Sequence, residues 1–150
     1  MSLVWLGFGV NDLTQKRSIS IGAERRPDKQ FDEETIDQIV RAMGNTSELA
    51  SKYQGMIRRY AVDVHEMLEE VARVLKENAS ATFVMGNSCL KGVFIKNSEG
   101  LIAAGELVGL SKVETWERDL PSGSRYLPTP TAGALSKRMR KEVIVRLKKG

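Results

Sequence analysis

The chain has 150 residues, 41% of them hydrophobic, which is enough for one domain with an ordinary core. Its net charge of +4 permits an anionic partner without requiring one. A single cysteine, Cys89, excludes an internal disulfide and indicates a reducing compartment, the cytoplasm. No apolar run approaches the roughly 18 residues of a membrane-spanning helix. The composition therefore predicts a cytoplasmic domain rather than a disulfide-rich secreted protein or a membrane protein.

Residues 1–30 are expected to form an irregular N-terminal segment, because polar residues are mixed there with glycine and proline. A first helix should follow. Asp32 can cap it, Phe31 and Ile36 can form a hydrophobic staple, and Gly44 stands where a C-terminal glycine belongs. Its apolar face is marked by helical spacing of Ile36, Ile39, Val40 and Met43.

A second, longer helix is predicted from Asn45 or Thr46 to about Lys76, because apolar residues keep helical spacing throughout this stretch. After it, the run Ala81–Met85 is typical of a short buried strand. The next helix should begin at a cap, Asn97 or Ser98, and run through Val108.

Two further strands are expected, Ser111–Leu120 and Lys141–Leu147, separated by a proline-rich loop over 121–134. The last strand places Val143, Val145 and Leu147 on one face. The order of helices and strands indicates an α/β fold. The last two strands have no helix between them, so they can pair antiparallel.

Two pairs of residues are candidates for substrate binding. Asn87 and Ser88 follow the carboxyl end of a strand, where open α/β sheets bind ligands, although the pair can also simply form a turn. Arg125 and Tyr126 lie in the proline-rich loop. There they could grip a phosphate and stack on a base, or Tyr126 could pin the loop to the body of the protein.

The C-terminal segment is strongly basic. From Ser136 to Gly150 it holds seven Lys and Arg side chains against one acidic side chain, Glu142. Arg138 and Arg140 belong to this segment, and they either flank a nucleic-acid groove or lie in solvent.

Other chemically active residues give weaker signals. His65 has no Cys or His at ligand spacing, so no metal site is predicted. Cys89 follows the candidate loop but has no obvious base beside it. Trp5 and Trp116 are expected in the core rather than as platforms for base stacking. No catalytic or cofactor-binding residue is identified.

Six short stretches support a resemblance to a known family when they are taken in order: Ser2–Gly7, Ser20–Gly22, Val84–Ser88, Gly92–Val93, Ser124–Pro128 and Arg138–Glu142. Together they resemble the C-terminal half of class I S-adenosylmethionine-dependent DNA methyltransferases. The members in question modify exocyclic amino groups of cytosine or adenine, and they have RNA-methylating relatives.

The resemblance implies a partial class I methyltransferase (Rossmann-like) sheet in which the first half of the fold is absent. Residues 31–150 would form the C-terminal half of the domain. Ala81–Met85 would be the fifth strand, Ser111–Leu120 the sixth, and Lys141–Leu147 an antiparallel seventh between them. Without its usual neighbour, Ala81–Met85 should present an unpaired edge.

The family holds its cofactor on a glycine-rich turn and its target amino group on a polar-Pro-Pro-aromatic tetrapeptide. The chain has neither motif. The resemblance therefore implies a truncated gene, one half of a split enzyme or a cloned fragment, and leaves open whether the chain alone is an enzyme. S-adenosylmethionine would be held by the absent half.

By the same resemblance, the chain would complete the target-base pocket and its basic rim with Asn87, Ser88, Arg125, Tyr126, Arg138 and Arg140. Its partners would be DNA or RNA, and either a second copy or a chain carrying the N-terminal half. The alternative is a non-catalytic module that binds nucleic acid or dimerises.

Overall fold

The structure is a computed structural model that describes residues 31–120 and 141–150. Its elements are α2 (Glu33–Ala42), a 3-10 turn η2 (Thr46–Glu48), α3 (Ser51–Val74), β1 (Ser80–Met85), β2 (Ser88–Leu90), β3 (Val93–Ile95), α4 (Asn97–Leu107), β4 (Leu110–Asp119) and β5 (Lys141–Lys149). The predictions for 1–30 and for the proline-rich loop lie outside the described residues.

Helix α2 begins and ends as the sequence predicts. The Asp32 carboxylate accepts hydrogen bonds from the backbone N–H of Thr35 at 2.9 Å and from its hydroxyl at 2.7 Å, which caps the helix. Gly44 follows the last turn with a φ of 118°, a conformation that favours glycine. Ile36 and Ile39 are fully buried, and Phe31 packs against the same core.

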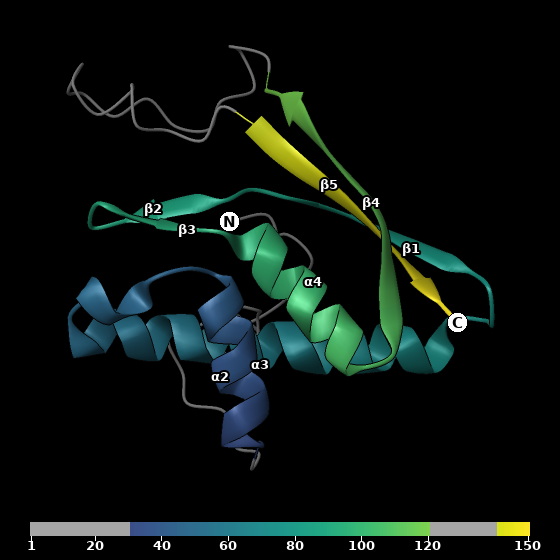
Figure 1. Cartoon of the computed structure of the whole chain (residues 1–150), viewed down its shortest axis with the longest axis horizontal. Coiled ribbons are helices and arrows are strands. Elements are labelled where there is room, and N and C mark those ends of the chain that lie inside the picture. Colours follow the sequence, from purple (N-terminus) through teal and green to yellow (C-terminus); the bar gives the residue numbers. More distant parts are fainter. Residues whose placement is uncertain (1–30, 121–140) are drawn as a thin grey trace, which may run out of the picture.

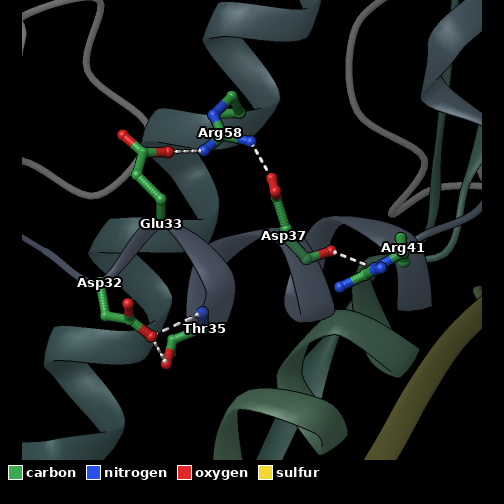
Figure 2. Close-up of polar contacts among 6 residues, drawn as sticks. All are labelled: Asp32, Glu33, Thr35, Asp37, Arg41 and Arg58. Atoms are coloured by element: carbon green, nitrogen blue, oxygen red, sulfur yellow. Dashed lines mark hydrogen bonds and ion pairs between the residues drawn. The ribbon is translucent and has the colours of Figure 1, made fainter.

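Two ion pairs from one arginine fasten α2 to α3 (Figure 2). The Arg58 guanidinium on α3 donates to the carboxylates of Glu33 and Asp37, which lie one turn apart on α2. The pKa of Arg58 is raised above its ordinary value, chiefly by the hydrogen bond to Asp37. Arg41 donates in turn to the Asp37 backbone carbonyl at 3.2 Å. The crossing of the two helices is thus fixed at the surface as well as in the core.

The second predicted helix starts later than expected. Thr46–Glu48 forms a 3-10 turn, and Leu49 is extended with φ −83° and ψ 146°, so α3 begins only at Ser51. The extended residue turns the Leu49 side chain into the core, where it is 4% exposed, and burial there outweighs helical continuity. No helix in the described part of the chain is long and apolar enough to cross a bilayer.

The larger sheet has the strand order β1-β5-β4, and β5 is antiparallel to both neighbours. Strands β1 and β4 therefore run parallel to each other on either side of β5. This arrangement confirms the prediction that the last strand lies antiparallel between the other two. In Figure 1, β5 crosses between β1 and β4 with the three helices on one side of the sheet.

The core lies between this sheet and the helices. Val143, Val145 and Leu147 of β5 face it and are at most 5% exposed, as the alternation in the sequence predicts. From the other strands, Phe83 and Met85 pack against the same cluster. The helices contribute Ile36, Ile39, Ala61, Leu68, Leu101 and Ala104.

The opposite face of the sheet is more open than expected, which corrects two predictions. Strand β1 is not buried on both faces but alternates between exposed and half-buried residues, and Val84 is 56% exposed. Trp116 is 41% exposed rather than part of the core, and the Arg146 guanidinium lies 5.7 Å from its ring centroid. Val84 and Trp116 flank Ile144 on the face that no described helix covers, although Ile144 itself is only 5% exposed.

A small hairpin, absent from the sequence predictions, lies between β1 and α4. Strands β2 and β3 pair antiparallel with Leu90 opposite Val93. The two residues between them, Lys91 and Gly92, have φ values of 51° and 89°, as a two-residue type I′ turn requires. Lysine is uncommon in that position, so the turn lacks the usual Asn-Gly signal.

Candidate functional site

The loop after β1 is held by the start of α4. The side-chain oxygen of Asn87 accepts hydrogen bonds from the backbone N–H of Ser98 at 3.0 Å and from its hydroxyl at 3.1 Å. Ser98 is 3% exposed, so these bonds satisfy polar groups that water does not reach freely. Asn87 therefore caps α4 from a different segment of the chain.

This arrangement corrects the prediction that Asn97 or Ser98 is the cap. The residue at the N-cap position is Lys96, whose side chain makes no capping bond. The polar residues at the start of α4 instead turn toward the β1–β2 connection. A cap supplied eleven residues upstream leaves no local pattern in the sequence.

Asn97 makes the second link between α4 and this loop. Its side-chain amide N–H₂ donates to the Gly86 carbonyl at 2.9 Å and to the Ser88 hydroxyl at 3.3 Å. A carbonyl can only accept, so the N–H₂ group must face Gly86 and the amide orientation is fixed. The amide oxygen receives no hydrogen bond from the described residues.

A cavity of about 290 Å³ lies beside these residues, at the carboxyl end of β1 and between α3 and the β2–β3 hairpin. Its volume is at the lower end of small-molecule sites. Most of its wall is apolar, and Ile57 and Ile95 in that wall are 5% and 3% exposed. The residues around it are Met56, Ile57, Tyr60, Ser88, Cys89, Leu90, Ile95 and Asn97.

Three of these residues bring hydrogen-bonding side chains to the cavity: Tyr60, Ser88 and Asn97. Burial raises the pKa of the Tyr60 hydroxyl above its ordinary value. The Cys89 thiol is free and exposed at the same cavity. An apolar hollow with a few polar groups is the usual form of a small-molecule site.

The hairpin that closes the cavity is anchored to the helices. The Lys91 ammonium at its tip lies 5.6 Å from the centroid of the Tyr53 ring on α3. At its base, the Lys96 N–H donates to the Met43 carbonyl at 2.9 Å. Both ends of the hairpin are therefore fixed against the helical layer.

Of the six predicted substrate-binding residues, the structure brings Asn87 and Ser88 together at this loop. Ser88 borders the cavity, whereas the Asn87 oxygen is engaged with Ser98. Arg125, Tyr126, Arg138 and Arg140 lie outside the described residues. The sequence does not identify Asn97 and Tyr60 as parts of a site, because its patterns predict a helix cap at Asn97 and place Tyr60 among the apolar positions of the long helix.

The described part of the basic C-terminal segment is largely neutralised. On β5, Lys141 pairs with Glu117 at 2.7 Å and Arg146 with Glu114 at 2.5 Å. Lys149 lies 3.3 Å from Glu77 and donates to the Ala72 and Leu75 carbonyls at the end of α3. Each of these three cations therefore has an acidic partner within the protein.

Nothing in the described residues provides a metal site. They contain no group of three His, Cys, Asp or Glu side chains placed to hold an ion. The His65 imidazole lies 3.9 Å from Glu69 one turn further along α3.

No protein-family model matches the chain, and no curated protein matches it. Among solved structures, it is similar to a protein of Thermus thermophilus that was provisionally described as a DNA modification methylase. The TM-score is 0.46 and the sequence identity 11%, over 60% of this chain and 36% of that one. The aligned region thus spans about a third of that protein. A likeness at this level does not establish a shared activity.

Proposed function

We propose that the chain is the C-terminal portion of an S-adenosylmethionine-dependent nucleic-acid methyltransferase, of the kind that methylates amino groups of DNA bases. One observation carries the proposal. Strand β5 runs antiparallel between two mutually parallel strands, β1 and β4, each of which is preceded by a helix. The sequence resemblance requires this order and direction for the fifth, seventh and sixth strands of that fold.

The position of the loop after β1 supports the same proposal. It lies at the carboxyl end of a strand, the edge at which open α/β sheets bind ligands. In this function Ser88 and the cavity beside it form part of the wall around a base that has left the nucleic-acid stack. Arg125, Arg138 and Arg140 supply a basic rim, and Tyr126 stacks on a base.

The described residues do not fit S-adenosylmethionine itself. Strand β1 is followed by a hairpin rather than by a glycine-rich turn into a helix, and such a turn is what holds the cofactor in this family. In the proposed function, the cofactor and the target amino group are therefore held by another polypeptide segment. A bound S-adenosylmethionine would supply an activated methyl group, so this chain contributes orientation rather than acid–base chemistry.

Reconstitution tests the proposal. The segment encoded immediately upstream of Met1 is co-expressed with this chain, and transfer of tritiated methyl groups to DNA and to RNA is measured. We expect transfer from the pair and none from the chain alone. A complex that forms but transfers no methyl group to either nucleic acid contradicts the proposal, as does an upstream segment without a glycine-rich turn.

Calorimetry of the chain alone provides a second measurement. Because the described residues lack the cofactor turn, we expect no binding of S-adenosylmethionine at micromolar concentrations. Near-stoichiometric, tight binding by the isolated chain would contradict the proposal that another polypeptide segment holds the cofactor.

The second candidate is a dimerising module without catalytic activity. Strand β1 is one of the two edge strands of the larger sheet in the described part of the chain. Its sequence, SATFVM, contains no charge and no proline. Such an edge lacks the features that usually prevent pairing with another strand. The same edge could accept either a second copy or a strand of the segment that carries the cofactor.

A further inference from the structure

We infer that the cavity between α3 and the β2–β3 hairpin binds a flat heterocycle of one or two rings that donates an N–H hydrogen bond to Asn97. This inference rests on the proposed function in one respect, because that function places a base in the same cavity. The test below uses no cofactor and no nucleic acid, so ring binding and methyl transfer can each fail without the other. Its structural basis is the polar groups, the wall and the size of the cavity.

The acceptor is the side-chain oxygen of Asn97. Both hydrogens of its amide group have partners, the Gly86 carbonyl at 2.9 Å and the Ser88 hydroxyl at 3.3 Å. These bonds hold the side chain in one orientation and leave the oxygen without a donor among the described residues. A fixed acceptor of this kind selects a ligand that carries a donor, since the oxygen then exchanges water for a ligand N–H.

The wall selects the rest of the ligand. Met56 and Ile57 of α3 face Leu90 and Ile95 of the hairpin, so the larger part of the lining is hydrocarbon and sulfur. The free-energy cost of removing water is large for a charged ligand against such a wall and small for a mostly apolar ring. Methionine adapts to aromatic rings particularly well.

The volume sets the size limit. A cavity of about 290 Å³ lies at the lower end of the range for small-molecule sites, which begins near roughly 300 Å³. It suits one or two fused rings but not a whole nucleotide with its sugar and phosphate. Any sugar or chain attached to the ring would extend through the open side of the cavity.

Matched small molecules test the inference with the full chain. Indole carries the ring N–H, and benzofuran has nearly the same shape with an ether oxygen in its place. Each is titrated at millimolar concentration while the backbone amide signals of the ¹⁵N-labelled protein are recorded. We expect indole to shift the signals of Leu90, Ile95 and Asn97, and benzofuran to bind about fivefold more weakly.

Two variants assign the acceptor. In Asn97→Ala the ratio of the two affinities should fall to about one, because the donor has lost its partner. Tyr60→Phe is the control, since it removes a second hydrogen-bonding group of the wall without removing the ring, and it should keep the ratio. If Asn97→Ala fails to fold, equal affinities in the wild type or a ratio lost in Tyr60→Phe still overturn the inference.

Several outcomes would overturn the inference. These are the absence of binding by either compound, equal affinities in the wild type, a ratio that disappears in Tyr60→Phe, and signal shifts confined to residues away from the hairpin. A ratio near five that is lost only in Asn97→Ala would establish the acceptor and the class of ligand.

Discussion

Asn87 caps α4, and this role predicts the effect of its substitution on stability. Asn87→Ala removes the acceptor for the N–H and the hydroxyl of the buried Ser98. Loss of a cap costs about 1 kcal/mol of folding stability, and we expect a decrease of that size in urea unfolding. Asn87→Asp is the matched control. It keeps the acceptor and places negative charge at the start of α4, so its stability should remain close to wild type.

The comparison separates a structural role from a binding role. If Asn87 acts only through α4, the two variants differ in stability and Asn87→Asp keeps the ligand affinity of the cavity. Equal destabilisation by both substitutions would show that the capping bonds contribute little.

Asp32 predicts how stability depends on pH at the start of α2. The hydrogen bonds from the Thr35 side chain and backbone lower the pKa of Asp32. Because the folded-state pKa is depressed, its contribution is present above the unfolded-state value of about 3.9 and is lost as the pH falls through the folded-state value. We therefore expect Asp32→Ala to be less stable than wild type at neutral pH.

Unfolding curves from pH 7 down to pH 2 measure this difference. It should stay constant to about pH 4 and then shrink as the wild-type carboxylate is protonated. A difference that persists unchanged to the lowest pH would mean that the charge of Asp32 is not what stabilises the helix.

These two caps show which residue roles can be predicted from sequence. Asp32 is predictable because its partner lies three residues away, within one turn. Asn87 is a candidate for substrate binding because it follows the carboxyl end of a strand. Its capping role is not predicted, because its partner lies eleven residues away, across a hairpin that the sequence does not predict. A contact between residues on either side of a hairpin leaves no regular spacing in the sequence from which it could be predicted.

At the scale of elements, α4 depends on small residues. A Cβ added to Gly105 would lie 2.6 Å from Cδ1 of Leu147, which is fully buried on β5. Overpacking of this kind costs about 1–3 kcal/mol, and it exceeds the roughly 1 kcal/mol that alanine gains over glycine in a helix. We expect Gly105→Ala to lower the free energy of unfolding measured in urea.

Gly55 in α3 is the matched control for that substitution. Its added Cβ would meet the Arg59 guanidinium at 3.5 Å, an ordinary van der Waals contact. Gly55→Ala should therefore raise stability by about 0.5–1 kcal/mol. Stabilisation by both substitutions would show that Leu147 moves aside easily and that α4 is loosely packed on the sheet.

Elements with strong periodicity can be predicted to within a few residues. The bounds of α2, β4 and β5 follow from local patterns, and so does the end of α4 near Gly109, whose φ is 84°. The predicted start of α3 is wrong, because the burial of Leu49 is a tertiary effect that interrupts a helical pattern. The β2–β3 hairpin escapes prediction because its strands are three residues long.

For the whole molecule, composition and periodicity predict an α/β fold, but only the family resemblance predicts the order β1-β5-β4. Pairing between β1 and β5 joins residues more than fifty positions apart, so local patterns do not encode it. The exposure of Val84 and Trp116 on the second sheet face is not predicted either. Val84, Ile144 and Trp116 lie side by side on three strands, and apolar residues of this kind are compatible both with a face that a helix covers and with one that stays exposed.

The two edges of the larger sheet differ in a way that predicts association. Strand β4 carries Lys112, Glu114, Glu117 and Arg118 and is interrupted by an irregularity between Lys112 and Glu114. Charges and bulges of this kind discourage pairing with another chain. Strand β1 has six uncharged residues and no such irregularity. We therefore expect self-association through β1 when the chain is studied alone.

A pair of substitutions tests which edge is used. Thr82 on β1 lies opposite Arg146, and Ser111 on β4 lies opposite Lys148, so a glutamate at either position faces a cation within its own sheet. Only Thr82→Glu would also place like charges together when two β1 strands meet about a two-fold axis. Sedimentation velocity over a hundredfold range of concentration should show a dimer for wild type and Ser111→Glu and a monomer for Thr82→Glu. A wild-type chain that stays monomeric throughout would refute self-pairing of this edge and leave it to a strand of different sequence.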